Sequence, residues 1–153
     1  MINAYTLLKF VHVVSVILWL GGISTLSVLL WRLKGERNRQ VVSALVQQSI
    51  SFGQRFVGPA SGLVLLTGLA MVGIARIGFT TFWVLWGLTG IAIHFIYGAV
   101  ILRKRSMRLA EALATGTDDA AFGIASRRLS QAQVVYLLIL ASVIWAMVLK
   151  PTL

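Results

Sequence analysis

The first residue in the chain that could carry chemistry is His12, which lies in a charge-free stretch running from Phe10 to Trp31. An ionisable side chain is costly to place within a membrane span, and it is a functional candidate for that reason. Trp19 and Gly22 lie seven and ten residues further on, so in a helix both share the face of His12. That face offers an imidazole nitrogen, an aromatic plate and a gap, which together suit an axial haem ligand or a metal ligand.

A second histidine, His94, lies in another apolar stretch and is surrounded by glycines. Gly87 and Gly90 precede it by seven and four residues, and Gly98 follows it by four. Glycines on a membrane helix allow a close helix contact, and they also leave clearance for a flat ring beside a ligating nitrogen. We therefore expect His94, with Gly90 beside it, to line a cofactor site or to make a hydrogen bond between helices.

One haem shared by the two histidines is not expected. His12 precedes Arg32 by 20 residues, whereas His94 precedes Arg103 by 9 residues. The difference of 11 residues corresponds to ~16 Å along two parallel helices. Because the axial ligands of one iron lie at nearly the same level, the histidines are predicted to serve different sites.

Three other side chains could complete a site of this kind. Met71 and Met147 lie near the C-terminal ends of their stretches, which in an up-and-down bundle are on the same side of the membrane as His12. A thioether is a soft ligand for haem iron or Cu(I). Methionine also fills irregular gaps in cores, which is the alternative for both. Arg55 could pair with a haem propionate, or its side chain could extend to a lipid phosphate.

The acidic residues exclude several kinds of chemistry at membrane depth. They are Glu36, Glu111, Asp118 and Asp119, and all four lie between the apolar stretches. Paired-carboxylate hydrolysis, carboxylate proton relays and Mg²⁺ or Ca²⁺ sites inside the membrane are therefore disfavoured. The chain has no cysteine, which excludes disulfides, thiolate catalysis and iron–sulfur clusters.

The elements that position these residues are membrane spans. Hydrophobic residues make up 58% of the chain and charged residues 12%, roughly half the charge of a soluble domain. Charge-free stretches cover 10–31, 56–75, 77–102 and 129–149, and each is long enough to cross a hydrocarbon core as a helix. We predict an all-α integral membrane protein, a single up-and-down four-helix bundle over residues 1–153.

The predicted helices extend beyond the apolar stretches at one end of the bundle. Their expected bounds are about 6–33, 52–75, 79–115 and 118–149. Residues 39–50 have apolar side chains at helical spacing, so an amphipathic helix should lead into the second span. Gly58-Pro59 should bend that span. Thr117 and the two aspartates after it are typical of a helix start, with a hydroxyl cap and an acidic first turn.

The basic residues predict the orientation of the bundle. The loops after the first and third spans hold Arg32, Lys34, Arg37, Arg39, Arg55, Arg103, Lys104, Arg105, Arg108, Arg127 and Arg128, and the other side holds Lys9, Arg76 and Lys150. By the positive-inside rule both long loops are cytoplasmic and both termini lie outside, in the bacterial cytoplasmic membrane. The net charge of +10 is then explained by orientation and contact with anionic lipid, and nucleic acid is not an expected partner.

The pattern of His12, Trp19 and Gly22 resembles the HemJ-like and CopD-like group of small four-helix membrane proteins. Arg55 followed by Gly58-Pro59, the segment 62–68, and His94 to Gly98 before a basic helix end agree with it in order, so the resemblance covers roughly residues 8–105. It implies haem b on His12 and oxidoreductase chemistry of the protoporphyrinogen oxidase type, or copper handling on the CopD-like side. HemJ-like sequences carry His-x-Lys at the start of the third span, where this chain has Thr80 to Phe82.

From these observations we expect a haem-b-binding membrane protein that acts in electron transfer, porphyrin oxidation or haem handling. His12 would be an axial ligand, and Trp19 and Gly22 would shape its pocket. Besides membrane lipid, the protein's expected partner is an unidentified redox protein or a porphyrin. The alternative is copper binding through His12, Met71 and Met147. A scaffold without a cofactor is the third possibility. The bare glycine faces would also suit a homodimer.

Overall fold

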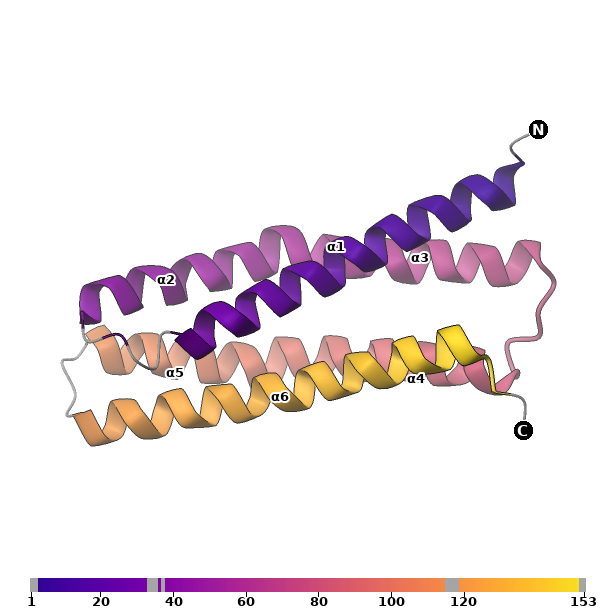
Figure 1. Cartoon of the computed structure of the whole chain (residues 1–153). Helices are drawn as coiled ribbons and strands as arrows, with labels where there is room; N and C mark the ends of the chain where they lie inside the picture. The colour runs from indigo at the N-terminus through magenta and orange to yellow at the C-terminus, as the bar shows by residue number, and fades with distance from the viewer. Residues whose placement is uncertain (1–2, 33–35, 37, 115–118, 152–153) are drawn as a thin grey trace.

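The computed structural model describes residues 3–32, 36, 38–114 and 119–151, and the elements below all lie in these ranges. They are the α-helices α1 (Ala4–Arg32), α2 (Arg39–Phe52), α3 (Gly58–Ile74), α4 (Phe82–Ile96), α5 (Arg103–Ala114) and α6 (Asp119–Leu149), and the π-helical segments η2 (Gly53–Val57) and η3 (Tyr97–Leu102). Figure 1 shows that α2, η2 and α3 form one long rod and α4, η3 and α5 another. With α1 and α6 the described chain forms four antiparallel rods.

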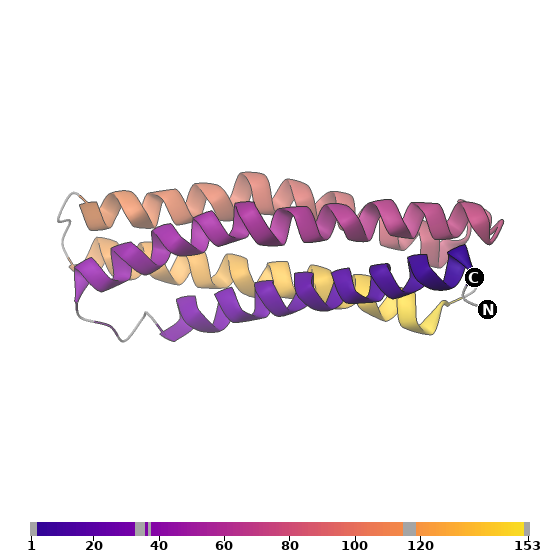
Figure 2. The same ribbon diagram turned by 90° about the horizontal axis from the view of Figure 1, so that it is seen from above.

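Each rod contains a helix long and apolar enough to cross a membrane, over Ala4–Arg32, Arg39–Ile74, Phe82–Ala114 and Ala120–Leu149. The predicted all-α four-helix bundle is therefore confirmed, and the described residues contain no strand. Figures 1 and 2 place both chain ends at one end of the bundle. The predicted bounds at 33, 115 and 118, together with Lys34, Arg37 and the cap at Thr117, fall outside the described residues.

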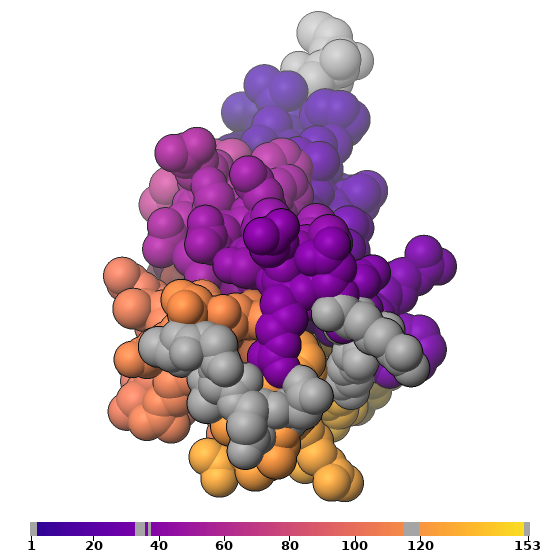
Figure 3. Space-filling view, turned by 90° about the vertical axis from the view of Figure 1, so that its left-hand side faces the viewer, coloured from indigo at the N-terminus to yellow at the C-terminus, as the bar shows by residue number. Residues whose placement is uncertain are grey.

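The opposite end of the bundle holds most of the basic residues and is called the basic end below. It is formed by the start of α2, the end of α5 and the start of α6, which come together in Figure 3. The side chain of Asn38 caps α2 by accepting hydrogen bonds from the backbone N–H groups of Gln40 and Val41. The predicted amphipathic helix is thus present, and it continues through η2 into the second span.

The bundle has two hydrophobic cores, which follow each other along its long axis. The core at the basic end consists of Leu30, Val42, Val46, Leu109, Leu113 and Leu129. The core of the spans consists of Trp19, Ile23, Val57, Ala60, Val64, Ile91, Leu140 and Val143. In the spans α1 packs on α3 and α4 packs on α6, whereas α3 and α4 hardly touch. The spans are therefore arranged as two helix pairs.

The second rod is π-helical just before Pro59, where the sequence predicts a bend. Proline lacks an N–H group and its ring clashes with the carbonyl four residues earlier, so the preceding turn is widened. At its far end α3 closes with backbone hydrogen bonds from Arg76 to Gly73 and from Ile77 to Val72. Arg76 there has a positive φ of 52°, and α4 begins at Phe82 rather than at residue 79.

Candidate functional site

A cavity of about 320 Å³ lies between the two helix pairs, at the boundary of the two cores. Both π-helical segments contribute to its wall, because Gly53, Gln54 and Val57 of η2 face Gly98, Ala99 and Leu102 of η3 across it. The remaining lining residues are Ile23, Leu26, Leu30, Ser49, Ile50, Gly58, Ser61, His94, Phe95, Arg103, Ser106, Gln133 and Tyr136. π-Helical turns are frequent at functional sites, and a cavity of this size is within the range of small-molecule pockets.

His94 forms the inner end of the cavity and is only 2% exposed. Its ring stacks on Tyr136, with centroids 3.8 Å apart, and meets the edge of Trp19 at 4.6 Å. Neither imidazole nitrogen has a hydrogen-bond partner among the described residues. A buried polar group without a partner is unfavourable unless something else satisfies it. His94 is therefore the strongest sign of a ligand in this cavity.

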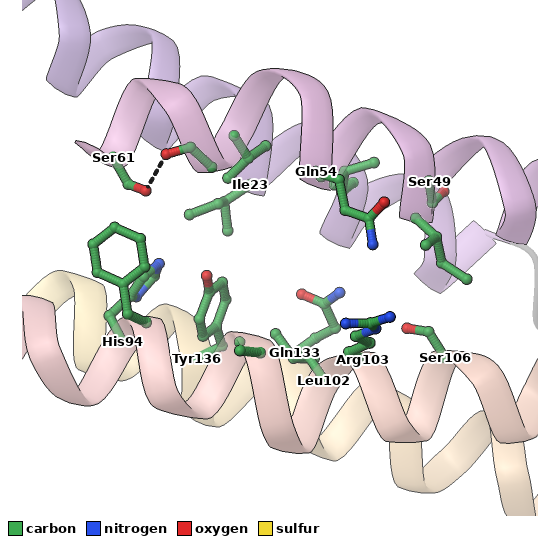
Figure 4. A pocket seen from close by; sticks show the side chains of 18 of the residues that line it. Ile23, Ser49, Gln54, Ser61, His94, Leu102, Arg103, Ser106, Gln133 and Tyr136 are labelled. Atoms are coloured by element: carbon green, nitrogen blue, oxygen red, sulfur yellow. Dashed lines mark hydrogen bonds between the residues drawn. The ribbon is translucent and has the colours of Figure 1, made fainter. Parts of the chain in front are cut away.

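The other polar groups of the cavity are one cationic donor, Arg103, and amide and hydroxyl groups that can donate or accept. Figure 4 shows Arg103, Gln133 and Tyr136 on one wall, opposite Gln54. The Oε1 atom of Gln133 lies 3.0 Å from the hydroxyl of Ser27, which also donates a 2.8 Å hydrogen bond to the carbonyl of Ile23. No carboxylate of the described residues lines the cavity. Its electrostatic character therefore suits a ligand that brings acceptors or negative charge.

His12 lies outside this cavity, in the packing of α1 against α3. Its Nδ1 atom is 2.9 Å from the hydroxyl of Thr67. That hydroxyl donates a 2.6 Å hydrogen bond to the carbonyl of Leu63, so it accepts from Nδ1–H of the neutral ring. The lone pair on Nε2 then remains available. Gly68 lies against the same ring, since a Cβ atom there would be 3.3 Å from Cε1 of His12.

The model of a family described as a predicted integral membrane protein (DUF2269) matches residues 6–151. The chain belongs to this family. A search of curated proteins and a search of solved structures each found no match. Membership of the family establishes an integral membrane protein, in agreement with the four long apolar helices. The finer assignment to the HemJ-like and CopD-like group does not follow from this match.

The structure places the two histidines at different levels of the bundle. His12 contacts Thr67 and Gly68 of α3, whereas His94 contacts Trp19, which lies two turns further along α1 than His12. Seven residues of α-helix correspond to ~10 Å. The two rings thus serve separate positions, as the depth of the spans predicts. Trp19 belongs to the surroundings of His94 rather than to those of His12.

The glycines and the arginine singled out in the sequence have other neighbours. Gly22 packs against η2, where an added Cβ would lie 3.1 Å from Val57. A Cβ at Gly90 would overlap with Val143 of α6, so the bare face there accepts a side chain of another helix. Arg55 is exposed and does not line the cavity.

The two methionines lie against different helices. Met147 of α6 packs into the gap left by Gly87 of α4. Met71 is three and four residues beyond Gly68 and Thr67 on α3, which puts it on the helix face that meets His12. No group of three or more histidine, cysteine or acidic residues in the described chain could hold a metal ion. Of the predicted sulfur ligands, only Met71 shares the face of α3 that His12 contacts.

Sequence reasoning missed Tyr136, Gln133, Gln54 and Thr67. Each is a polar residue in or next to an apolar stretch, and such residues often form hydrogen bonds between membrane helices. That signal could have marked Gln133 and Thr67 as candidates. Their partners depend on which helices pack together, which the spacing within one helix does not reveal.

Proposed function

We propose that this protein binds haem b in the membrane through His12 and acts in electron transfer or haem handling. The observation that carries the proposal is the hydrogen-bonded chain from His12 Nδ1 to Thr67 and on to the carbonyl of Leu63. Ligating histidines almost always donate their other ring N–H to such a partner, which fixes the ring and leaves Nε2 for the metal. The second nitrogen of His12 takes no part in this chain of bonds and is left for a ligand.

The residues around His12 fit an axial ligand of haem in two respects. Thr67 holds the ring in one orientation, and Gly68 presents bare backbone against its edge. Met71 would be the second residue to hold the haem, because methionine and histidine together are an established pair of haem ligands. Bound haem would supply reversible one-electron oxidation and reduction. The resemblance to HemJ-like proteins over residues 8–105 supports the same assignment.

The test is an absorption spectrum of protein purified in detergent from haem-supplied cells, first oxidised and then reduced with dithionite. We expect a Soret band with sharp reduced α and β bands, and their loss in His12→Ala. Thr67→Val removes the hydrogen-bonding hydroxyl at nearly constant volume, and haem affinity should fall about 10- to 100-fold. Thr89→Val is the matched control, because Thr89 is an exposed threonine of α4. A colourless wild-type protein would disprove the proposal.

Copper is the second candidate function, and one observation favours it. Met71 follows Thr67 by four residues and so lies on the face of α3 that His12 contacts, and both residues are ligands that suit Cu(I). This alternative predicts that Met71→Leu lowers Cu(I) affinity, whereas Met147→Leu does not, because Met147 packs on Gly87. Equal Cu(I) affinity in wild type and Met71→Leu would refute it.

A further inference from the structure

We propose that the cavity at His94 binds a slender carboxylate amphiphile whose acid group meets Arg103 and whose other end carries an oxygen that meets His94. The proposal concerns a site separate from His12 and does not depend on haem. Its basis is the shape of the cavity, the exposure of its lining residues and the distribution of polar groups along it.

The shape of the cavity favours a chain over a disc. Its lining on the α4–α5 rod runs from His94 to Ser106, which corresponds to ~18 Å at ~1.5 Å per residue. A volume of about 320 Å³ spread over this length leaves a narrow passage. Most of the wall is aliphatic or aromatic, with residues such as Ile23, Leu30 and Ile50. An extended apolar chain fits such a passage.

The exposure of the lining residues shows where a ligand could enter. Gln54, Phe95, Ala99 and Arg103 are exposed, whereas the residues at the bottom, such as His94, are buried. The exposed residues lie on η2 and on the α4–α5 rod, at the side where α3 and α4 hardly touch. The mouth therefore opens sideways between the helix pairs, with Arg103 toward the basic end. A molecule dissolved in the membrane could reach it.

Polar groups at the two ends of the cavity define the ligand further. At the end nearer the basic end of the bundle, Arg103 supplies a positive charge with no carboxylate of the described residues beside it in the lining. Arginine binds carboxylates with charge-assisted hydrogen bonds. At the inner end, the two unpartnered nitrogens of His94 require a polar partner. Arg103 follows His94 by nine residues, so their backbone positions lie ~13 Å apart along the rod.

A comparison of decanoate with ω-hydroxydecanoate tests both ends. Calorimetric titration would use the full chain in nanodiscs of zwitterionic lipid, with empty nanodiscs subtracted. Partition into the lipid alone would favour decanoate, because the added hydroxyl group makes ω-hydroxydecanoate less hydrophobic. We expect the protein to bind ω-hydroxydecanoate about three- to ten-fold more tightly, since it gains one neutral hydrogen bond at His94. In His94→Leu this preference should disappear.

The acid end is tested with a pair of arginine variants on the same helix. Arg103→Gln should weaken binding of both probes about ten-fold or more, because a charged hydrogen bond is lost. Arg108→Gln removes an equal charge from α5 but does not line the cavity, so affinity should be unchanged. Ala99→Phe should block the mouth, whereas Val100→Phe, next to it but outside the lining, should not.

Three results would overturn the proposal. The first is tighter binding of decanoate than of its hydroxy derivative in the wild type. The second is an equal loss of affinity in Arg103→Gln and Arg108→Gln. The third is binding of a two-chain anionic phospholipid in preference to both probes, which would identify the basic residues as a lipid-contact surface. If His94→Leu fails to fold, Ala99→Phe still tests the site, because unchanged binding there excludes the cavity.

Discussion

Replacement of Gly90 by alanine tests whether the bare face of α4 serves helix packing or leaves room for a ring. A Cβ atom at Gly90 would overlap with Cγ2 of Val143 on α6. Valine is branched at Cβ and is confined to one preferred χ1 rotamer in a helix, so it cannot turn aside easily. At Gly87 the corresponding neighbour is the terminal methyl of Met147, which can move. Gly90→Ala should therefore cost more stability than Gly87→Ala.

The magnitude follows from two opposing contributions. Overpacking a close contact costs about 1–3 kcal/mol. Alanine in place of glycine within a helix returns about 1 kcal/mol. We expect Gly90→Ala to lower the free energy of unfolding by up to about 2 kcal/mol, and by about 1–3 kcal/mol relative to an alanine at an open helical position. Val143→Ala opens the space that the new methyl group needs, so the double variant should be more stable than the sum of the single changes by about 1 kcal/mol or more.

The assay is reversible unfolding in mixed detergent micelles, followed by circular dichroism. Gly73→Ala on α3 is the control, because no atom lies within 4 Å of a Cβ at that position. Its stability should be unchanged or slightly raised. Additive effects of Gly90→Ala and Val143→Ala would refute the packing role, and so would a Gly90→Ala variant as stable as Gly73→Ala. Loss of haem in a fully stable Gly90→Ala variant would instead indicate clearance for a cofactor.

The other predictions concern the His12 contact, the helix ends and the orientation of the bundle. Gly68→Val should displace the ring of His12, since even a Cβ there would be 3.3 Å from Cε1, and haem content measured by absorbance should fall while Gly62→Val, at an open position, has no effect. Asn38→Ala removes the cap of α2 and should cost about 1 kcal/mol of unfolding free energy, measured by thermal melts. Arg76→Gly relieves a positive φ of 52° and should raise stability by up to about 1 kcal/mol in the same melts. Because the chain has no cysteine, single variants report orientation: an impermeant thiol reagent should label Thr80→Cys but not Ala114→Cys in intact cells, and the reverse pattern would contradict the positive-inside assignment.

The spans could be predicted from the sequence because each is a charge-free apolar stretch whose length matches a hydrocarbon core. The amphipathic helix before the second span could also be predicted, since its apolar residues repeat at helical spacing. The π-helical segments could not. Pro59 predicts a bend, but no residue in Tyr97–Leu102 has a comparable backbone restriction.

The candidate sites were only partly visible in the sequence. His12 and His94 stand out because an ionisable residue is unusual in an apolar span. Their partners Thr67 and Tyr136 are brought to them by the packing of α1 on α3 and of α4 on α6. The glycine spacing around His94 suggested clearance for a ring. In the folded chain Gly87 and Gly90 instead receive Met147 and Val143 from α6, because close packing of a helix pair takes up the same space.

The π-helical segment η2 allows one long helix to change its packing partner halfway along. The buried residues of α2 and α3 have the same helical phase, since Val42 and Val46 are followed 18 residues later by Ala60 and Val64. Eighteen residues are five α-helical turns, so an uninterrupted α-helix would turn both pairs of residues the same way. In the folded chain α2 packs on α5 and α3 packs on α1. The wider turn between them takes up one residue more than an α-helical turn and so rotates one half relative to the other; deleting a single residue there should restore an α-helical turn and leave both halves facing their partners.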